Sequence, residues 1–224
     1  MKSIALIAVA SMGVAANALT IIDDFSTAYS KTITSGSWVD SQIGTFVGGS
    51  GERDVEMRVI SNPLAQQLDL TITGSQLAVV SNGFGTLSKV SLQYDAIGDE
   101  AGNTGANRFL TNGAGFAAGS LAGENALVVR FLGNDLDMDV TATLRRTGGI
   151  ISQMTQTRAG GSGIGDMVFN FGGTLGDADS LTFEFSTARS GDFAIEGIEA
   201  VPEPATMVTL GLGLAAALRR RNRK

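Results

Sequence analysis

The chain contains no cysteine and no histidine among its 224 residues. Without cysteine it has no disulfide, no thiolate nucleophile and no zinc–thiolate site. Without histidine it lacks the commonest general base and the commonest transition-metal ligand, which excludes the usual serine and cysteine triads. Proline is scarce, with 3 residues, and only 17% of the residues are charged. What is present, 43% apolar residues and 30 glycines, suffices for one domain with a core and many turns.

The first 18 residues have the layout of a secretory signal peptide. Lys2 supplies one positive charge, an uncharged apolar run covers residues 4–14, and the small residues Ala16 and Ala18 follow. This layout predicts a signal helix in residues 1–18 and cleavage after Ala18. The alternative, a buried N-terminal helix, would need an N-cap and a polar face, and the segment has neither.

The last 24 residues, 201–224, combine three elements in a fixed order. Pro202, Glu203 and Pro204 form a Pro-Glu-Pro triplet, and the uncharged segment 205–218 follows. The chain ends in the basic residues Arg219, Arg220, Arg221, Arg223 and Lys224. As a helix, the uncharged segment would be about 21 Å long, against about 30 Å for the hydrocarbon core of a bilayer. The sequence predicts a short membrane helix that its basic end retains on the cytoplasmic side.

This tail resembles the PEP-CTERM sorting signal of Gram-negative and related bacteria. The same tail also carries the name ice-binding protein C-terminal domain, which does not by itself imply ice binding. The resemblance implies export, transient insertion into the inner membrane, and processing by an exosortase near the Pro-Glu-Pro triplet. It also implies the exosortase and the secretion machinery as partners. The expected destination is the cell surface or the extracellular polysaccharide matrix of a biofilm.

Removing the two targeting segments changes the charge of the remaining body, residues 19–200. The whole chain has a net charge of −6, but six of its sixteen basic residues and one of its 22 acidic residues lie outside the body. The body therefore carries 10 basic and 21 acidic residues, a net charge of −11. Because such a surface repels nucleic acid, we expect no nucleic-acid partner.

Within the body, apolar and polar residues alternate with the period of a β-strand. The alternating runs, with a more continuously apolar one at 126–132, cover residues 55–59, 68–72, 90–94, 138–144, 167–171 and 181–185. Clusters of Gly, Asn, Asp and Ser separate them. We therefore expect an all-β fold, a two-sheet antiparallel sandwich of jelly-roll type, with residues 101–125 as a long loop or a distorted crossover. Short motifs such as Ile22-Asp23-Asp24-Phe25 resemble a recurrent globular region of exported PEP-CTERM proteins, a resemblance that implies no particular activity.

Two sets of carboxylates are candidate calcium ligands: Asp135, Asp137 and Asp139, and, near the ends of the body, Asp23, Asp24 and Asp192. The first set would share one face of an extended segment, although it lacks the Gly and Glu of an EF-hand loop. The second set would meet if the first and last strands lie together, as in jelly-roll carbohydrate-binding modules. The alternatives are a solvated strand face for the first set and ordinary turn residues for the second.

Sugar binding outside the cell commonly uses aromatic platforms. Trp38, within a polar segment expected to be a turn, is the candidate platform, and the alternative is a tryptophan in the core. Two carboxylates would suffice for a glycan-active enzyme, but the sequence identifies no pair. The segment Glu52-Arg53-Asp54 is better interpreted as the charge-paired start of a strand.

The sequence thus predicts an exported, non-enzymatic envelope or extracellular-matrix protein with no catalytic residues and no required cofactor. One alternative is a carbohydrate-binding module on exopolysaccharide, stabilised by calcium. A second alternative is a glycan-active enzyme that uses paired carboxylates.

Overall fold

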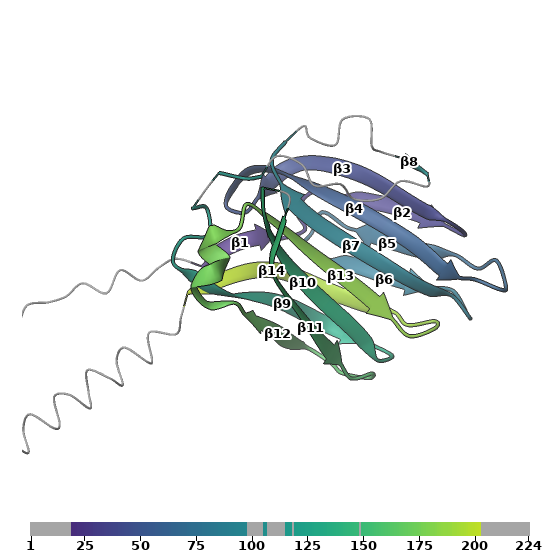
Figure 1. The fold of residues 1–224 in the computed structure, drawn as a ribbon. Helices are drawn as coiled ribbons and strands as arrows, with labels where there is room; N and C mark the ends of the chain where they lie inside the picture. The colour runs from purple at the N-terminus through teal and green to yellow at the C-terminus, as the bar shows by residue number, and fades with distance from the viewer. Residues whose placement is uncertain (1–18, 98–104, 107–114, 118, 148, 203–224) are drawn as a thin grey trace, which may run out of the picture.

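The computed structural model describes residues 19–97, 105–106, 115–117, 119–147 and 149–202. Within this part of the chain, two antiparallel sheets of seven strands each lie face to face (Figure 1). The predicted two-sheet antiparallel sandwich is confirmed. The predicted signal helix and the predicted membrane helix at 205–218 lie outside the described residues, and within these residues no helix is long and apolar enough to cross a membrane.

Sheet A contains the first and last strands of the body. Its order is β12 (Gly165–Asn170), β9 (Glu124–Asn134), β14 (Phe193–Pro202), β6 (Ala78–Asn82), β5 (Leu68–Ile72) and β2 (Tyr29–Ile33), and β1 (Thr20–Asp23) pairs with β14 off this path. All of these pairings are antiparallel.

Sheet B carries the longer hairpins. Its order is β11 (Gly149–Arg158), β10 (Met138–Arg146), β13 (Ser180–Thr187), β7 (Leu87–Asp95), β4 (Gly49–Ser61), β3 (Ser37–Phe46) and β8 (Gly105–Ala106). A single 3₁₀ turn among the described residues, η1 (Gly172–Asp177), follows β12. The segment expected to be a loop or crossover, 101–125, is described only in part: it contributes β8, turns at 119–123 and the first residues of β9.

The alternating runs of the sequence form the core between the sheets. Leu92, Phe183 and Ala142 are direct neighbours across β7, β13 and β10, and all three are buried. Phe185 of sheet B stacks on Phe193 of sheet A, with ring centroids 5.1 Å apart. Since directly opposed residues share one face, the apolar half of each run points inward and its polar half points outward.

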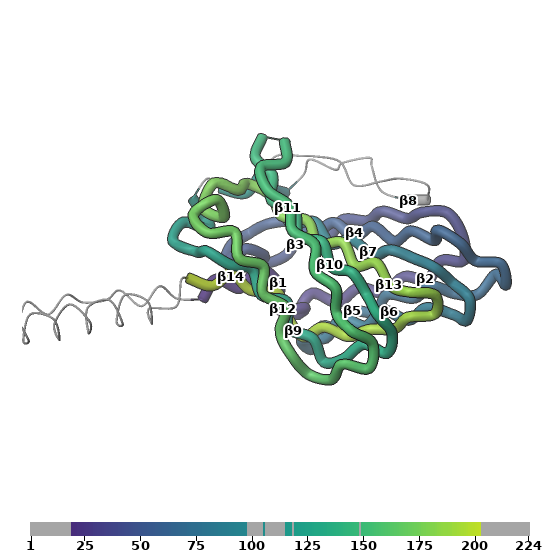
Figure 2. Tube along the Cα trace, turned by 60° about the horizontal axis from the view of Figure 1, so that its bottom comes forward, coloured from purple at the N-terminus to yellow at the C-terminus, as the bar shows by residue number. Residues whose placement is uncertain are grey.

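The beginning and the end of the described chain lie side by side. β1 pairs with β14 so that Thr20 faces Ala200, and both strands meet at one end of the sandwich (Figures 1 and 2). The backbone N–H groups of Val47 and Gly48, in the turn between β3 and β4, donate to the carbonyls of Ile22 and Ile21. β1 is therefore held by sheet A on one side and by the β3–β4 turn on the other.

Candidate functional site

The outward half of sheet B forms two rungs of polar side chains. The first rung runs across β4, β7, β13, β10 and β11 as Glu56, Ser91, Glu184, Thr141 and Thr155. The second rung, two residues along each strand, runs as Asp54, Gln93, Thr182, Thr143 and Gln153. All ten side chains are polar, because they occupy the positions that alternate with the buried apolar ones.

These rungs form the floor of a hollow of about 220 Å³. Eight of the ten rung residues line the hollow, together with Arg58 and Arg145. None of its lining residues is apolar or aromatic. We call this site the polar hollow.

Ion pairs and hydrogen bonds fix most of the side chains in the polar hollow. Arg58 Nη2 lies 2.6 Å from Glu56 Oε1, and Lys89 Nζ lies 2.5 Å from Glu184 Oε1. On the second rung, Gln153 donates to the Thr143 hydroxyl at 3.0 Å. The two carboxylates among the lining residues, Glu56 and Glu184, are therefore each paired with a cation.

Arg145 differs from these residues. On β10 it faces Ser180 of β13, and this pair lies two residues along each strand from the pair of Thr143 and Thr182. Its Nε atom is buried and has no hydrogen-bond partner, and within the described residues no carboxylate forms an ion pair with it. Arg145 is thus a cation that lines the polar hollow and has no ion pair among the described residues.

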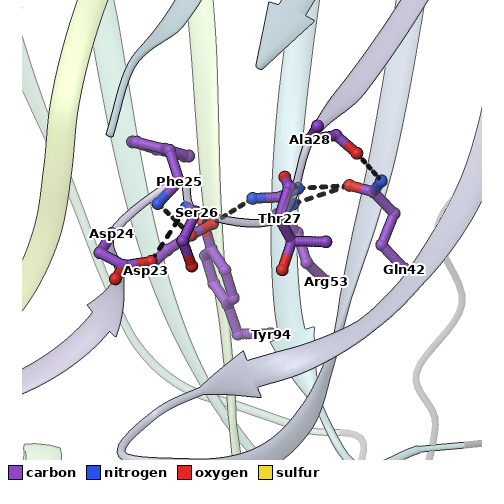
Figure 3. A network of polar contacts seen from close by, with 9 residues as sticks. All are labelled: Asp23, Asp24, Phe25, Ser26, Thr27, Ala28, Gln42, Arg53 and Tyr94. Atoms are coloured by element: carbon purple, nitrogen blue, oxygen red, sulfur yellow. Dashed lines mark hydrogen bonds and ion pairs between the residues drawn. The ribbon is translucent and has the colours of Figure 1, made fainter. Parts of the chain in front are cut away.

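A second polar cluster lies between the sheets rather than on the surface (Figure 3). Arg53 of β4 and Asp23 of β1 form an ion pair of 2.7 Å, and both side chains are buried. The Tyr94 hydroxyl donates to the same Asp23 oxygen at 2.9 Å, while the Phe25 N–H donates to the other oxygen. The remaining guanidinium nitrogens donate to Gln42 and to the Thr27 carbonyl. We call this cluster the buried network.

The electrostatics of the buried network follow from its burial. Burial raises the pKa of the Asp23 carboxyl, and the charge of Arg53 is the largest of the influences that oppose this rise. Burial, helped by the negative charge of Asp23, also raises the pKa of Tyr94 well above its usual value. Because its donors and acceptors are used by one another, the network joins β1 to sheet B and leaves no position for a ligand.

The buried network also corrects one expectation. The sequence suggested that Arg53 pairs with its neighbours Glu52 and Asp54, but its ion pair is with Asp23. The reason is that successive residues of a strand point to opposite faces, so Arg53 faces the core while Asp54 faces outward.

The structure does not bring the carboxylates near the chain ends together. The first and last strands are neighbours, as the calcium hypothesis required, with Asp23 facing Ile198. Asp192, however, precedes the opposite end of β14, where it accepts a hydrogen bond from the Asn82 N–H. Asp24 instead accepts from the Ser26 N–H. In the part of the chain that the structure describes, no group of three or more Asp, Glu, His or Cys side chains could hold a metal ion.

The first aspartate set is likewise separated. Asp135 and Asp137 lie in the turn between β9 and β10, so the expected extended face does not form there. Asp135 accepts from the Asp192 N–H and Asp137 from the Gly160 N–H, both at 2.6 Å. Asp139, within β10, accepts from the Thr157 hydroxyl. Asp135 and Asp137 therefore act as acceptors in a turn, and only Asp139 lies on a strand face as the alternative of a solvated strand face stated.

Trp38 lies in strand β3 and not in a turn. It faces the buried Met57 across the β3–β4 pair, so it is on the core side of sheet B, and it is half-buried. The Lys31 ammonium lies 3.1 Å from the centroid of its ring. A cation of the chain itself therefore covers one face of the only tryptophan, where a sugar ring would stack.

Fold and site together define a two-sheet antiparallel β-sandwich with a polar hollow on one outer face. Its last strand, β14, ends at Pro202, the first residue of the Pro-Glu-Pro triplet. A family model, the PEP-CTERM protein-sorting motif, matches residues 200–224. The chain carries this motif, which implies export, exosortase processing and sorting to the cell surface. Glu203, Pro204, the basic tail 219–224, Ala16 and Ala18 lie outside the described residues.

Solved structures offer only a weak likeness. A family 11 carbohydrate-binding module from Clostridium thermocellum has a TM-score of 0.38 and 12% identity, covering 82% of this chain and 95% of its own. The enzymatically active domain of bacteriophage CBA120 tailspike protein 4 has a TM-score of 0.38 and 10% identity over 80% of this chain and 20% of its own. A family 29 carbohydrate-binding module in complex with mannohexaose has a TM-score of 0.34 and 10% identity over 78% and 92%. No curated protein matches the chain in sequence.

The polar hollow was not among the sites that the sequence suggested. One signal could have indicated it: the polar residues that alternate with the core in run 138–144 are Asp139, Thr141 and Thr143, and the next residue on that face is Arg145. The residues that share the rungs of Thr141 and Thr143 lie 43 and 39 residues away on β13 and 50 residues away on β7, so the site can be recognised only once the strand order is known.

Proposed function

We propose that this chain is an exported, non-enzymatic protein of the cell envelope or extracellular matrix, whose body binds its target without transforming it. The observation that carries the proposal is the direct continuation of β14 into the sorting motif, because Pro202 is still paired with Glu124 of β9. The folded body is thus attached to its sorting signal with no intervening linker.

The state of the carboxylates supports binding over catalysis. A carboxylate-based glycan-active enzyme needs one carboxyl group that carries a proton to the leaving group. The two glutamates that line the polar hollow, Glu56 and Glu184, are each engaged by a cationic side chain. A neighbouring cation favours the ionised form of a carboxyl group, so neither glutamate is suited to donate a proton.

The polar hollow favours a second, more specific candidate function, the binding of an exopolysaccharide. Its hydroxyl, amide and guanidinium groups are those that hydrogen-bond sugar hydroxyls, and they line one continuous concave surface. The hollow as described contains no aromatic platform, so recognition would rest on hydrogen bonds. Calcium is not part of this candidate.

A glycan array probed with the full-length protein in detergent tests this candidate. We expect saturable binding that is lost when Thr143 and Gln153 are both replaced by alanine. The matched control is Trp38→Ala, which we expect to retain binding. Loss on Trp38→Ala alone would contradict the polar hollow as the site, and shortening of a bound polysaccharide would contradict the non-enzymatic role.

Mass spectrometry of the mature protein from producing cells tests the delivery route. We expect an N-terminus at Leu19 and a C-terminus that precedes Lys224. A chain that still begins at Met1, or that ends at Lys224 in the matrix fraction, would contradict export or processing respectively.

A further inference from the structure

One cation that lines the polar hollow has no ion pair among the described residues. The acids among the lining residues of the hollow, Glu56 and Glu184, are paired with Arg58 and Lys89 at 2.6 and 2.5 Å. Arg145 remains, without an ion pair among the described residues.

The position of Arg145 is suited to a ligand. It lines the hollow at the level of Ser180, beyond the Thr143 and Thr182 pair. Arg145 follows Thr141, the residue that faces Glu184, by four positions, which places it about 13 Å along the strand from the ion pair of Glu184. Because its guanidinium has no ion pair among the described residues, a carboxylate supplied by a ligand would be its charged partner.

The chemistry of the guanidinium group narrows the ligand class. A guanidinium presents a planar fork of donors that matches a carboxylate with two parallel hydrogen bonds. Next to Arg145, Thr143 and Gln153 offer a hydroxyl and an amide within the same hollow, which suit the ring hydroxyls of a sugar. A sugar that carries a carboxylate, a uronic acid, meets both requirements.

We infer that Arg145 binds the carboxylate of a uronate residue, so that the polar hollow selects acidic over neutral polysaccharide. This inference rests on the exopolysaccharide-binding candidate above and names its substrate class. The selection is local, because the acidic body as a whole repels a polyanion, and salt screens that repulsion beyond about 8 Å at physiological ionic strength.

The test compares two polymers that differ only in the carboxylate. Binding of the full-length protein in detergent is measured by calorimetry at 150 mM NaCl against polygalacturonate and against the same polymer after its carboxyl groups are reduced to primary alcohols. We expect wild type to bind polygalacturonate about tenfold more tightly. Arg145→Gln should remove this preference, leaving the two affinities within about twofold of each other.

Arg146→Gln is the matched control. Arg146 is the next residue of β10 and is exposed, with its guanidinium 3.5 Å from Asp177 and outside the hollow. We expect this variant to keep the wild-type preference. If Arg146→Gln removes the preference as well, or if polyglutamate competes as well as polygalacturonate, the binding is a general response to negative charge and the inference is wrong.

The remaining outcomes separate this inference from the proposed function. Equal binding of both polymers by wild type would overturn selection by Arg145 while leaving polysaccharide binding intact. Binding of neither polymer, with a neutral glycan bound on the array, would overturn the uronate inference alone. No binding of any polysaccharide would overturn both. Dextran sulfate bound as tightly as polygalacturonate, and lost on Arg145→Gln, would show that the site takes sulfate as well and contradict carboxylate selection.

Discussion

The two faces of sheet B carry charge in opposite ways. On the inner face, every guanidinium nitrogen of Arg53 has a hydrogen-bond partner, and both oxygens of Asp23 accept hydrogen bonds. On the outer face, Arg145 has a buried Nε with no partner. The same alternation of residues builds both faces. The difference teaches that the saturated cluster holds the two sheets together, whereas the outer face keeps a cation without an ion pair, at which we propose that a ligand binds.

The reason lies in the cost of removing charge from water. A buried ion pair regains its desolvation energy only when further hydrogen bonds satisfy the remaining donors and acceptors, and the loss of one partner leaves an uncompensated charge. The buried network meets this condition. The polar hollow is open to solvent, so its charges need no such complete pairing.

The largest effect is expected from breaking the inner pair. Arg53→Met should destabilise the protein by about 3–5 kcal/mol, because it leaves the Asp23 carboxylate buried without its cation. Urea unfolding followed by circular dichroism measures the change. The combined change Asp23→Leu with Arg53→Met should recover most of the loss, since no buried charge then remains. A loss below about 1 kcal/mol for Arg53→Met alone would contradict the role given to the buried network.

Alkaline pH should act on the inner face next. Tyr29 and Tyr94 are the two tyrosines of the chain, and burial raises the pKa of both. Because the fold favours the neutral phenol, this contribution to stability is complete below the unfolded pKa of about 10 and is lost as pH rises toward the folded value. Absorbance at 295 nm should show tyrosinate only as the protein unfolds. Tyrosinate in the folded protein at pH 10 would contradict the burial.

The substitution Tyr94→Phe tests how much of this alkaline loss of stability comes from Tyr94. It removes the hydroxyl that donates to Asp23 at 2.9 Å and should cost about 1–3 kcal/mol at pH 7, since it leaves a buried acceptor with one donor fewer. It should also weaken the loss of stability above pH 10, which urea titrations at pH 8 and pH 10.5 would measure. If the loss of stability above pH 10 is unchanged in this variant, groups other than Tyr94 cause it.

The outer face should tolerate the corresponding change. Lys89→Met breaks the ion pair with Glu184, whose two side chains are 33% and 37% exposed. We expect a loss below about 1 kcal/mol, because solvent screens the pair. A loss similar to that of Arg53→Met would remove the distinction between the two faces.

The smallest effect is expected at Asp192, where burial and the neighbouring Asp135 raise the pKa. A raised folded pKa means that stability is complete below the unfolded value of about 3.9 and falls as pH rises through the folded value. Asp192→Asn avoids this loss and retains an acceptor for the Asn82 N–H. We expect a rise in Tm below about 2 °C at pH 7 and none at pH 3. A decrease at pH 7 would show that the ionised form is favoured in the fold.

The strands could be predicted from the sequence because the alternation of apolar and polar residues is a local property of each segment. Leu68, Leu70 and Ile72 are all buried in β5, as their spacing predicted. The sequence was not sufficient for the ion pair of Arg53, since Asp23 lies 30 residues earlier and on the other sheet. The interpretation of Trp38 as a residue of a polar turn was wrong because the surrounding serines, glycine and aspartate hid a strand at the edge of the sandwich.

The candidate site depended on strand order, which the sequence did not contain. Glu56 and Glu184 lie on one rung only because β7 is placed between β4 and β13. The composition did exclude metal–thiolate and histidine chemistry, and the tail predicted the sorting motif that matches residues 200–224. The sorting motif could therefore be predicted from the sequence, whereas the polar hollow could be found only from the folded structure.

The most direct test of the outer face as the binding face is an NMR titration of the ¹⁵N-labelled full-length protein in detergent with trigalacturonate. We predict saturable shifts of the backbone amides of Thr141 and Thr143 and of the Gln153 side-chain amide, with the Trp38 indole N–H unchanged. Shifts centred on the Trp38 indole, with those of the polar hollow unchanged, would contradict the account.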